Sequence, residues 1–231
     1  MNLKDNIHSS LEEVKGDEAW RMFRILSEFT EGFDKLSDLD LSVTVFGSAR
    51  FDENDFYYKK TVELSQRLGE QGFPIISGGG PGIMEAANRG AADVDQVSVG
   101  LNIELPYEQK PNPYQNVALS FRYFFARKVM FVKHSMGYVC MPGGFGTLDE
   151  LFEALTLMQT NRIYHMPLVL FGTNFWSGLI VWMKQSLLEL KTVSDIDFDL
   201  IKITDDIDEV VSIMTSHREW KKEQILLSKE K

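Results

Sequence analysis

A glycine turn between a strand-like run and a helical run constrains this chain more than any other feature. Tyr138 to Met141 is apolar, the stretch PGGFGTLDE (Pro142 to Glu150) follows it, and Leu151 to Leu155 has helical character. A strand that passes through a glycine turn into a helix N-terminus makes an anion site, because unpaired backbone N–H groups and the helix dipole point at the same spot. The stretch therefore predicts a phosphate-binding turn with a carboxylate, Glu150, in the first turn of the helix.

A second copy of this arrangement lies earlier in the chain. Phe73 to Ile76 runs into SGGGPG (Ser77 to Gly82), and a helical run begins at Ile83. One such turn can mean only that glycine permits a tight bend. Two turns of this kind, with the hydroxyl of Thr147 at a helix start, favour a ligand that carries phosphate. Neither stretch fits GxGxxG or GxxxxGK[ST], so NAD and ATP chemistry lose support.

Strands and helices alternate along most of the chain. This alternation predicts right-handed βαβ units and a parallel sheet that is covered on both faces, which is an α/β, Rossmann-like, doubly wound fold. The expected strands are 41–46, 73–77, 97–103, 138–141, 167–171 and 200–203, and the expected helices are 57–71, 82–93, 118–135, 147–159, 175–190 and 206–215. We expect the 118–135 helix to be buried, because it is apolar almost all round.

Three segments are expected at carboxyl ends of the strands, namely 47–50, 77–80 and 142–144. In an open parallel sheet, ligands sit beyond these ends near the switch in strand order. The segments therefore point to one crevice, and Gly47 and Ser48 join the two glycine turns as candidate binding residues.

The ends of the chain are expected to differ from this α/β domain, which we place at residues 41–216. Residues 1–40 have an apolar helical period and predict an extension of one or two helices that packs on the domain or on a partner subunit. Residues 217–231 form a highly charged tail that we expect to fray.

The formal net charge of −10 argues against general nucleic-acid binding, which normally needs a basic face. An anionic ligand would then need local cations, and Arg50, Arg89, Arg127 and Lys128 lie in or beside the glycine motifs. The single Cys140 and the absence of a signal-peptide pattern predict a cytoplasmic protein. The most apolar long run, 167–183, is interrupted by glycine and polar residues and predicts no membrane span.

The two glycine motifs resemble those of the LONELY GUY family, whose members are often mislabelled lysine decarboxylases. The family pattern PGGxGTxxE is matched at every fixed position from Pro142 to Glu150, the companion glycine stretch is matched from Ser77 to Asn88, and an Arg-Lys pair is matched at Arg127 and Lys128. The resemblance covers roughly 41–215. It implies hydrolysis of the N-glycosidic bond of a nucleoside 5′-monophosphate, such as a cytokinin ribotide or AMP, to give the free base and ribose 5-phosphate.

Candidate site residues follow from the turns and from this resemblance. Glu150 is expected to assist the attack of water at the anomeric carbon, and Arg127 to orient or neutralise the substrate. The predicted substrate-binding residues are Gly47, Ser48, Gly79, Gly80, Met84, Glu85, Arg127, Lys128, Gly143, Gly144, Gly146, Thr147 and Glu150.

Each candidate has an ordinary structural explanation as well. A first-turn glutamate can simply stabilise the helix dipole, by about 0.3–1 kcal/mol at an exposed site. In contrast, a carboxylate beside the anomeric carbon stabilises an oxocarbenium-like transition state, and Glu85 is a candidate for binding. Arg127 lies among apolar residues, where a guanidinium needs an anionic partner.

Other residue types argue for neither a metal nor an organic cofactor. Cys140 is expected to be a core thiol, since no histidine belongs to its motif. The four histidines lack metal-ligand spacing. Lys133 lies outside both glycine stretches, which counts against a pyridoxal phosphate decarboxylase.

The sequence therefore predicts a nucleoside 5′-monophosphate phosphoribohydrolase that needs no cofactor and assembles as a homodimer or larger homo-oligomer. Two alternatives stay open. The first is a binding protein without catalysis, such as the molybdenum-cofactor carriers of the same general fold, and the second is a nucleotide-sensing interaction module. An intact PGGxGTxxE stretch counts against the first alternative.

Overall fold

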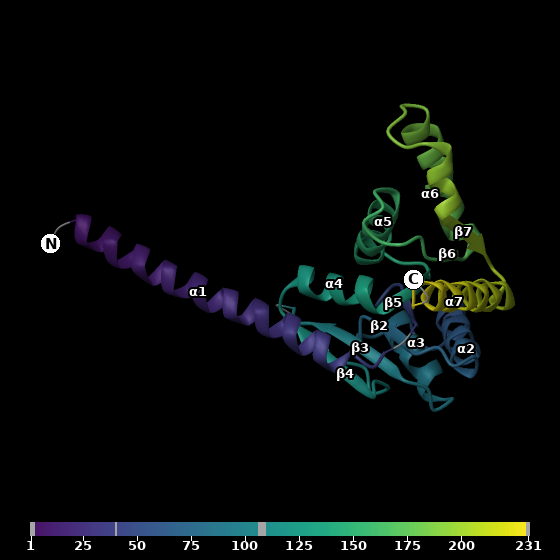
Figure 1. Cartoon of the computed structure of the whole chain (residues 1–231), viewed down its shortest axis with the longest axis horizontal. Helices are drawn as coiled ribbons and strands as arrows, with labels where there is room; N and C mark the ends of the chain where they lie inside the picture. Colours follow the sequence, from purple (N-terminus) through teal and green to yellow (C-terminus); the bar gives the residue numbers. More distant parts are fainter. Residues whose placement is uncertain (1–2, 40, 106–109, 230–231) are drawn as a thin grey trace.

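A computed structural model describes residues 3–39, 41–105 and 110–229 of the chain, and Figure 1 shows its arrangement. In chain order the elements are α1 (Leu3–Lys35), β1 (Ser42–Phe46), α2 (Phe56–Glu70), β2 (Ile75–Ser77), α3 (Ile83–Ala92), β3 (Ser98–Ile103), β4 (Val117–Phe121), α4 (Phe124–His134), β5 (Ser135–Cys140), α5 (Phe145–Gln159), β6 (Leu168–Phe171), α6 (Thr173–Trp182), a π-helical turn η1 (Met183–Leu188), a 3-10 helix η2 (Asp195–Leu200), β7 (Ile201–Thr204) and α7 (Ile207–Lys229).

The described strands form one seven-stranded sheet in the order β4-β3-β2-β1-β5-β6-β7, and every pair of neighbours is parallel. Parallel neighbours must be joined by crossovers, and helices supply most of these connections. The predicted α/β fold with a doubly wound parallel sheet is therefore confirmed.

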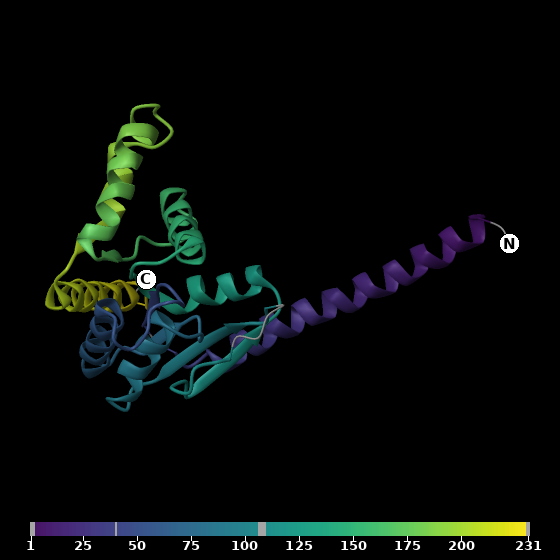
Figure 2. The same ribbon diagram turned by 180° about the vertical axis from the view of Figure 1, so that it is seen from behind.

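Helices cover both faces of the sheet, as Figure 2 shows from behind. On one face, Phe131 of α4, Leu151 of α5 and Trp176 of α6 belong to one buried cluster. On the other face, Ile83 of α3 and Met214 of α7 belong to a second buried cluster, together with residues of α2. Strands between two such layers lose exposure on both sides, and all five residues of β1 are buried.

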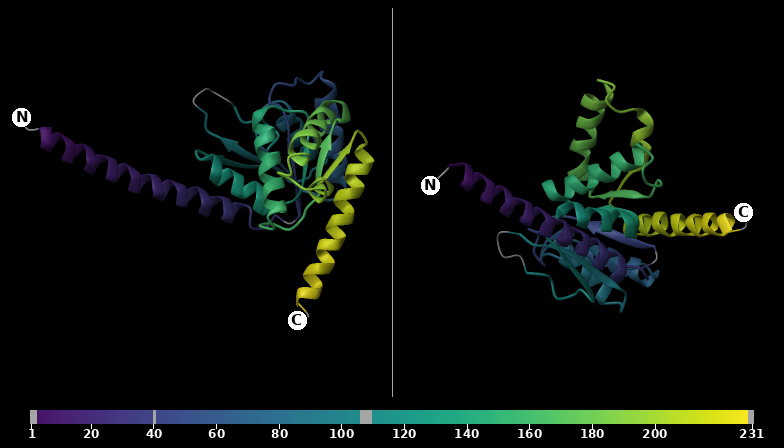
Figure 3. Two further views of the ribbon diagram at one scale, coloured as in Figure 1. Left: turned by 90° about the horizontal axis from the view of Figure 1, so that it is seen from above. Right: turned by 60° about the vertical axis from the view of Figure 1, so that its left-hand side comes forward.

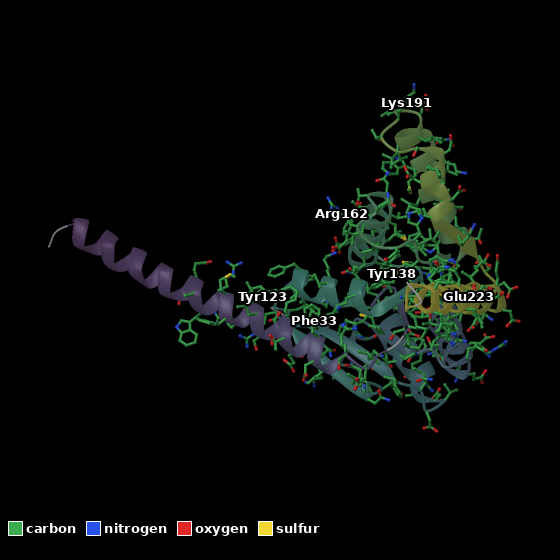
Figure 4. The ribbon with its side chains drawn as sticks, in the orientation of Figure 1. Phe33, Tyr123, Tyr138, Arg162, Lys191 and Glu223 are labelled. Carbon is green, nitrogen blue, oxygen red and sulfur yellow. The ribbon has the colours of Figure 1, made fainter. Side chains whose placement is uncertain are left out.

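Helix α1 is a single helix of 33 residues, and much of it extends away from the sheet (Figures 1 and 3). Its C-terminal part lies beside α4. There the carboxylate of Glu28 accepts hydrogen bonds from the backbone N–H groups of Arg122 at 2.9 Å and Tyr123 at 3.4 Å. A carboxylate at a helix N-terminus satisfies unpaired donors and favours the dipole. Figure 4 places Phe33 and Tyr123 at this junction.

The prediction of one buried helix over 118–135 is wrong in two respects, namely the bounds of the helix and its burial. Its first part is the edge strand β4, which pairs with β3 in the register Ile103↔Phe121, and its last residue, Ser135, starts β5. Helix α4 occupies only Phe124–His134 and leaves Phe124 and Phe125 about half exposed. The sequence did not identify β4 as a strand because it is short and an aromatic run follows it. The apolar residues of the two together fit the period of a helix as well as that of a strand.

The C-terminal part also differs from expectation. The helix expected over 206–215 continues as α7 through the segment that was expected to fray, as far as Lys229. Lys222 pairs with Glu219 at 3.3 Å along one side of this extension, and such pairs support an exposed helix. The expected helix over 175–190 is instead α6 followed by the π-helical turn η1. In the described part of the chain, no helix is both long enough and apolar enough to cross a membrane.

Candidate functional site

The carboxyl ends of β1 and β5, which are neighbours at the centre of the sheet, mark the point where the strand order switches from one side of the sheet to the other. From β1 the chain proceeds to β2 on one side, and from β5 it proceeds to β6 on the other side. Open parallel sheets bind ligands in the crevice at this switch point. A cleft of about 760 Å³ opens there, a volume within the usual range for small-molecule sites. Its described lining residues are Phe46, Gly47, Ser48, Ala49, Arg50, Gly78, Met84, Ile103, Leu105, Phe124, Arg127, Phe131, Gly144, Phe145, Gly146, Thr147, Leu148 and Glu150.

The second glycine loop presents free donors to this cleft. In the described part of the chain, the first main-chain bond at the start of α5 joins Leu148 N–H to Gly144 O at 3.0 Å. The N–H groups of Phe145, Gly146 and Thr147 therefore have no acceptor among the described residues. Three N–H groups at the positive end of a 15-residue helix make an anion site.

Gly143 lets Thr147 lie close beneath this loop. A Cβ atom on Gly143 would collide with the side chain of Thr147, whose Cβ would be only 2.6 Å away. Thr147 is buried at 5% exposure and lines the cleft. Gly143 itself does not line the cleft, so its contribution is the space that it leaves for the threonine.

The first glycine loop is held from behind by side-chain amides. Asn112 Nδ2 donates to the carbonyl oxygens of Gly79 at 3.1 Å and Gly80 at 3.0 Å, and Gln115 Nε2 donates to Gly79 O at 2.7 Å. Asn88 Oδ1 accepts hydrogen bonds from Asn112 Nδ2 at 2.9 Å and from a serine hydroxyl of the loop. We call Asn88, Asn112 and Gln115 the amide clamp. Since Gly79 and Gly80 are buried behind it, they do not line the cleft.

A short loop at the end of β1 connects the two glycine loops. Ser48 N–H donates to Pro142 O at 3.1 Å, and Ser48 O accepts the N–H of Ile83 at 3.0 Å. The latter bond occupies a donor at the N-terminus of α3, so this terminus presents one donor fewer to a ligand. Gly82, with φ of +68°, allows the close approach, because a Cβ there would lie 2.5 Å from Ser48 O.

Glu150 is the buried carboxylate of the cleft, with 6% of its surface exposed. Burial raises its pKa to about 7, and the positive charges of Lys128 and Arg127 oppose that rise. A carboxyl group with this pKa changes its charge near neutral pH, as a general base or acid requires. Glu150 is therefore the group of the cleft that is suited to proton transfer.

Arg127 lies deep in the same cleft. Its guanidinium packs on the rings of Phe124 and Phe131, 5.3 and 5.6 Å from their centroids, and Nη1 donates to Leu101 O at 3.5 Å. Its Nε is buried and has no acceptor among the described residues. Burial lowers the Arg127 pKa, and attraction to Glu150 opposes that effect. The site therefore contains a positive group with unused hydrogen-bonding capacity next to its carboxylate.

Lys128 and Glu85 lie outside the cleft. Lys128 Nζ pairs with Glu153 at 2.6 Å, Asp149 at 3.0 Å and Glu150 at 3.5 Å, and it lines a neighbouring groove. Burial lowers the Lys128 pKa, but hydrogen bonds to Glu153 and Asp149 outweigh this and the pKa is raised. The carboxylate of Glu85 accepts a hydrogen bond from the Tyr58 hydroxyl at 2.9 Å.

The predicted site residues thus divide into two groups. Gly47, Ser48, Met84, Gly144, Gly146, Thr147, Arg127 and Glu150 meet in the cleft, whereas Gly79, Gly80, Glu85, Lys128 and Gly143 stand behind or beside it. Lys133 also lies apart from the cleft, against the ring of Phe33. Cys140 is a fully buried thiol whose pKa is raised by burial, in agreement with the expected core role.

Sequence reasoning missed the apolar lining and the amide clamp. The cleft has apolar and aromatic walls of the kind that hold a planar ring, formed by Phe46, Ile103, Leu105, Phe124 and Phe131. These residues come from four separate elements and connections, so no local pattern identifies them. One feature of the sequence could have indicated the amide clamp: two of its residues, Asn112 and Gln115, lie close together in a proline-containing loop.

Comparisons with known proteins show which family and fold this chain resembles. Residues 84–214, more than half of the chain, match the family model described as "possible lysine decarboxylase". A probable cytokinin riboside 5′-monophosphate phosphoribohydrolase of Oryza sativa subsp. japonica is 29% identical over 151 residues, which are 64% of this chain and 61% of that protein. A pyrimidine/purine nucleotide 5′-monophosphate nucleosidase of Escherichia coli K12 is 30% identical over 140 residues, which are 56% of this chain and 30% of that protein.

Solved structures show the same fold at lower identity. The molybdenum cofactor carrier protein of Chlamydomonas reinhardtii superposes with a TM-score of 0.59 and 20% identity over 78% of this chain and 99% of that chain. The molybdenum cofactor binding protein of Rippkaea orientalis gives a TM-score of 0.56 and 20% identity over 76% and 94% of the two chains. These likenesses establish the Rossmann-like fold. Since the family model spans both the strand-to-helix turn of PGGFGTLDE and the buried Glu150, the chain belongs to the LONELY GUY family, whose model carries the description "possible lysine decarboxylase".

Proposed function

We propose that this protein hydrolyses the N-glycosidic bond of a nucleoside 5′-monophosphate and releases the free base and ribose 5-phosphate. The observation that carries the proposal is the position of Glu150. This buried carboxylate, with its pKa near 7, shares one cleft with the free N–H groups at the start of α5. A phosphate at those N–H groups and a carboxylate one helical turn further on suit a substrate that has a phosphate at one end and a reactive sugar carbon nearby.

The proposed reaction assigns a role to each group. The phosphate accepts hydrogen bonds from the N–H groups of Phe145, Gly146 and Thr147. The bond between the anomeric carbon and the base nitrogen breaks, and the ribose gains oxocarbenium character that ionised Glu150 stabilises. Water forms the new C–O bond and gives one proton to Glu150. Protonated Glu150 then passes this proton to the base nitrogen as the base leaves, which restores the carboxylate. Atoms and charge balance with water as the only co-reactant.

Arg127 and the apolar lining complete this assignment. The guanidinium of Arg127 has an unused Nε donor and is held between two aromatic rings, so it can orient a substrate oxygen or nitrogen without large motion. The walls formed by Ile103, Leu105 and Phe124 accept the flat face of a nucleobase. Both a cytokinin ribotide and a common purine nucleotide such as AMP fit this chemistry.

A panel of substrates tests the proposed function. Purified protein is incubated with AMP, IMP, CMP and a cytokinin ribotide, and the released base and ribose 5-phosphate are measured by chromatography. Equal amounts of the two products, absent with the Glu150→Gln protein prepared in the same way, are expected. If no base is released from any of the four, while the protein binds AMP, the fold serves binding alone, as in the molybdenum-cofactor carriers that share it.

We also propose that the protein acts in the cytoplasm as a homo-oligomer. The reduced, buried Cys140 suits a reducing compartment. On α1, the side chains of Trp20, Phe23 and Leu26 are more than half exposed, and contiguous apolar surface of this kind marks an interface. Light scattering of an active sample at micromolar concentration tests the assembly, because a mass near the 26.4 kDa of one chain would contradict it. The Trp20→Glu, Phe23→Glu double variant is expected to lower the measured mass.

A further inference from the structure

Two positively charged side chains line the cleft in the described part of the chain, Arg50 and Arg127. They differ in their surroundings. Arg127 is largely buried between Phe124 and Phe131 and is attracted by Glu150. Arg50 is exposed, and its guanidinium has no hydrogen-bond or ion-pair partner among the described residues. Arg50 therefore places an unpaired charge on the cleft wall.

The backbone that carries Arg50 is firmly held. Arg50 N–H donates to Ser48 Oγ at 3.1 Å, and Ser48 is tied to Pro142 and to Ile83 by the main-chain bonds described above. This loop therefore has a fixed position relative to both glycine loops. An exposed cation on a fixed backbone needs to order only its side chain when it meets an anion, which lowers the entropic cost of binding.

Charge also favours a role for Arg50 toward the phosphate. The whole chain carries a formal net charge of −10, which repels a phosphate dianion. The N-terminus of α5 supplies only about half of a positive charge. Arg127 is offset by Glu150, and Lys128 is surrounded by three carboxylates. Among the described cations in or beside the cleft, Arg50 is thus the one without a carboxylate partner.

We propose that Arg50 selects phosphorylated substrates by contacting, from the solvent side, the phosphate held at the start of α5. This inference rests on the proposed function, and it assigns substrate selection to a residue outside both glycine motifs. The contact is the same in the ground state and in the transition state, because the phosphate does not react. Its loss therefore raises KM and leaves kcat nearly unchanged.

The test compares Arg50→Gln with a matched control, Arg89→Gln. Both variants remove one positive charge, so both change the overall charge equally. Arg89 pairs with Glu53 at 3.4 Å and does not line the cleft. Arg50→Gln is expected to raise KM for the best nucleoside 5′-monophosphate by about 10- to 100-fold, the worth of a charge-assisted hydrogen bond, with kcat within a few-fold. Arg89→Gln is expected to leave KM within about twofold.

Two further measurements separate Arg50 from the reaction itself. The unphosphorylated nucleoside should give the same kcat/KM with Arg50→Gln and the wild type, and Arg50→Lys should restore part of the nucleotide KM. Isothermal titration with ribose 5-phosphate reports on the contact without chemistry. If the wild type binds ribose 5-phosphate but releases no base, weaker binding by Arg50→Gln supports the role of Arg50 although the proposed reaction fails. If Arg50→Gln and Arg89→Gln bind ribose 5-phosphate equally well, or if Arg50→Gln slows the nucleoside as much as the nucleotide, the proposal is overturned.

Discussion

The two glycine loops are built from the same local pattern, yet the structure uses them differently. Each follows a buried strand and leads into a helix that carries a glutamate near its start. Glu85 lies in the first turn of α3, whereas Glu150 lies in the second turn of α5, because that helix begins at Phe145, two residues earlier than predicted. The carbonyl groups of the first loop are occupied by the amide clamp, and one N–H donor of α3 is occupied by Ser48. The second loop keeps three N–H groups free at the cleft.

The two glutamates differ in the same way. Glu85 is half-buried and accepts a hydrogen bond from Tyr58, so its carboxylate has a stable partner. Glu150 is buried beside Arg127 and Lys128, and its pKa is raised to about 7. A strand-glycine-helix pattern therefore specifies a turn and an aligned helix, while the partners of the turn decide whether it serves as scaffold or as binding site.

The largest expected effect distinguishes the two glutamates by activity. Glu150→Gln should lower kcat by about 10²- to 10⁴-fold, because it removes the charge and the proton acceptor of the reaction. Glu85→Gln, the matched change after the first loop, should keep kcat within a few-fold of wild type. Steady-state release of free base measures both. Near-wild-type turnover by Glu150→Gln would show that another group performs the chemistry.

The pH profile should show the raised pKa of Glu150. If the ionised carboxylate is the active form, kcat/KM should fall about tenfold per pH unit below about pH 7 and level off above it. A profile that stays flat from pH 5 to pH 8 would contradict the assignment. The Glu85→Gln variant should reproduce the wild-type profile, since Glu85 does not line the cleft and accepts a hydrogen bond from Tyr58.

The free energy of unfolding should fall as the pH rises, whereas kcat/KM should rise. The pKa of Glu150 is higher in the folded state, about 7, than the ordinary value of 4.5, so the folded state binds more protons between these values. The stabilisation from this group is fully present below pH 4.5 and is lost as the pH rises through about 7. Thermal melting of wild type and Glu150→Gln across this window measures it, and the difference in Tm between them should change with pH.

The amide clamp should matter for folding more than for chemistry. Asn112→Ala removes hydrogen bonds to Gly79, Gly80 and Asn88 and leaves buried polar groups unpaired, so the free energy of unfolding should fall by roughly 2–3 kcal/mol. Asn54→Ala, an exposed asparagine outside the clamp, should change it by less than about 0.5 kcal/mol. Urea unfolding compares the two variants, and equal midpoints would show that the clamp does not hold the first loop.

The sequence was sufficient to predict those parts of the site whose residues are consecutive in the chain. Glycines after buried runs predicted both turns, and the alternation of strands and helices predicted the parallel sheet. The prediction did not distinguish the loops, because the amide clamp comes from 88–115 and reaches Gly79 and Gly80 only after folding. Lys128 shows the same limit, since it is adjacent to Arg127 in sequence but lines a neighbouring groove, where it pairs with Asp149 and Glu153 and also reaches Glu150.

Strand β4 shows a different limit. Its residues alternate in burial because successive side chains point to opposite faces of the sheet, of which one is covered and the other is more exposed, and the aromatic residues that follow extend the apolar run into α4. A single pattern of apolar residues over 118–135 fitted a helix as well as a strand followed by a helix. The pairing partner, which is distant in sequence, decided between them.

The smallest expected effect compares glycines of the two loops. A Cβ on Gly144 would meet nothing within 4 Å, so Gly144→Ala should leave the free energy of unfolding within about 0.5 kcal/mol of wild type. Gly144 lines the cleft beside the free N–H groups, however, and the added methyl group should raise the nucleotide KM several-fold. Gly79→Ala should do the reverse: with φ of +73° and Asn102 in the way of a Cβ, it should cost about 1–3 kcal/mol of stability. Melting curves and KM values for the two variants, measured together, test whether Gly79 supports the fold while Gly144 belongs to the binding surface, and a stability loss in Gly144→Ala equal to that in Gly79→Ala would contradict this division.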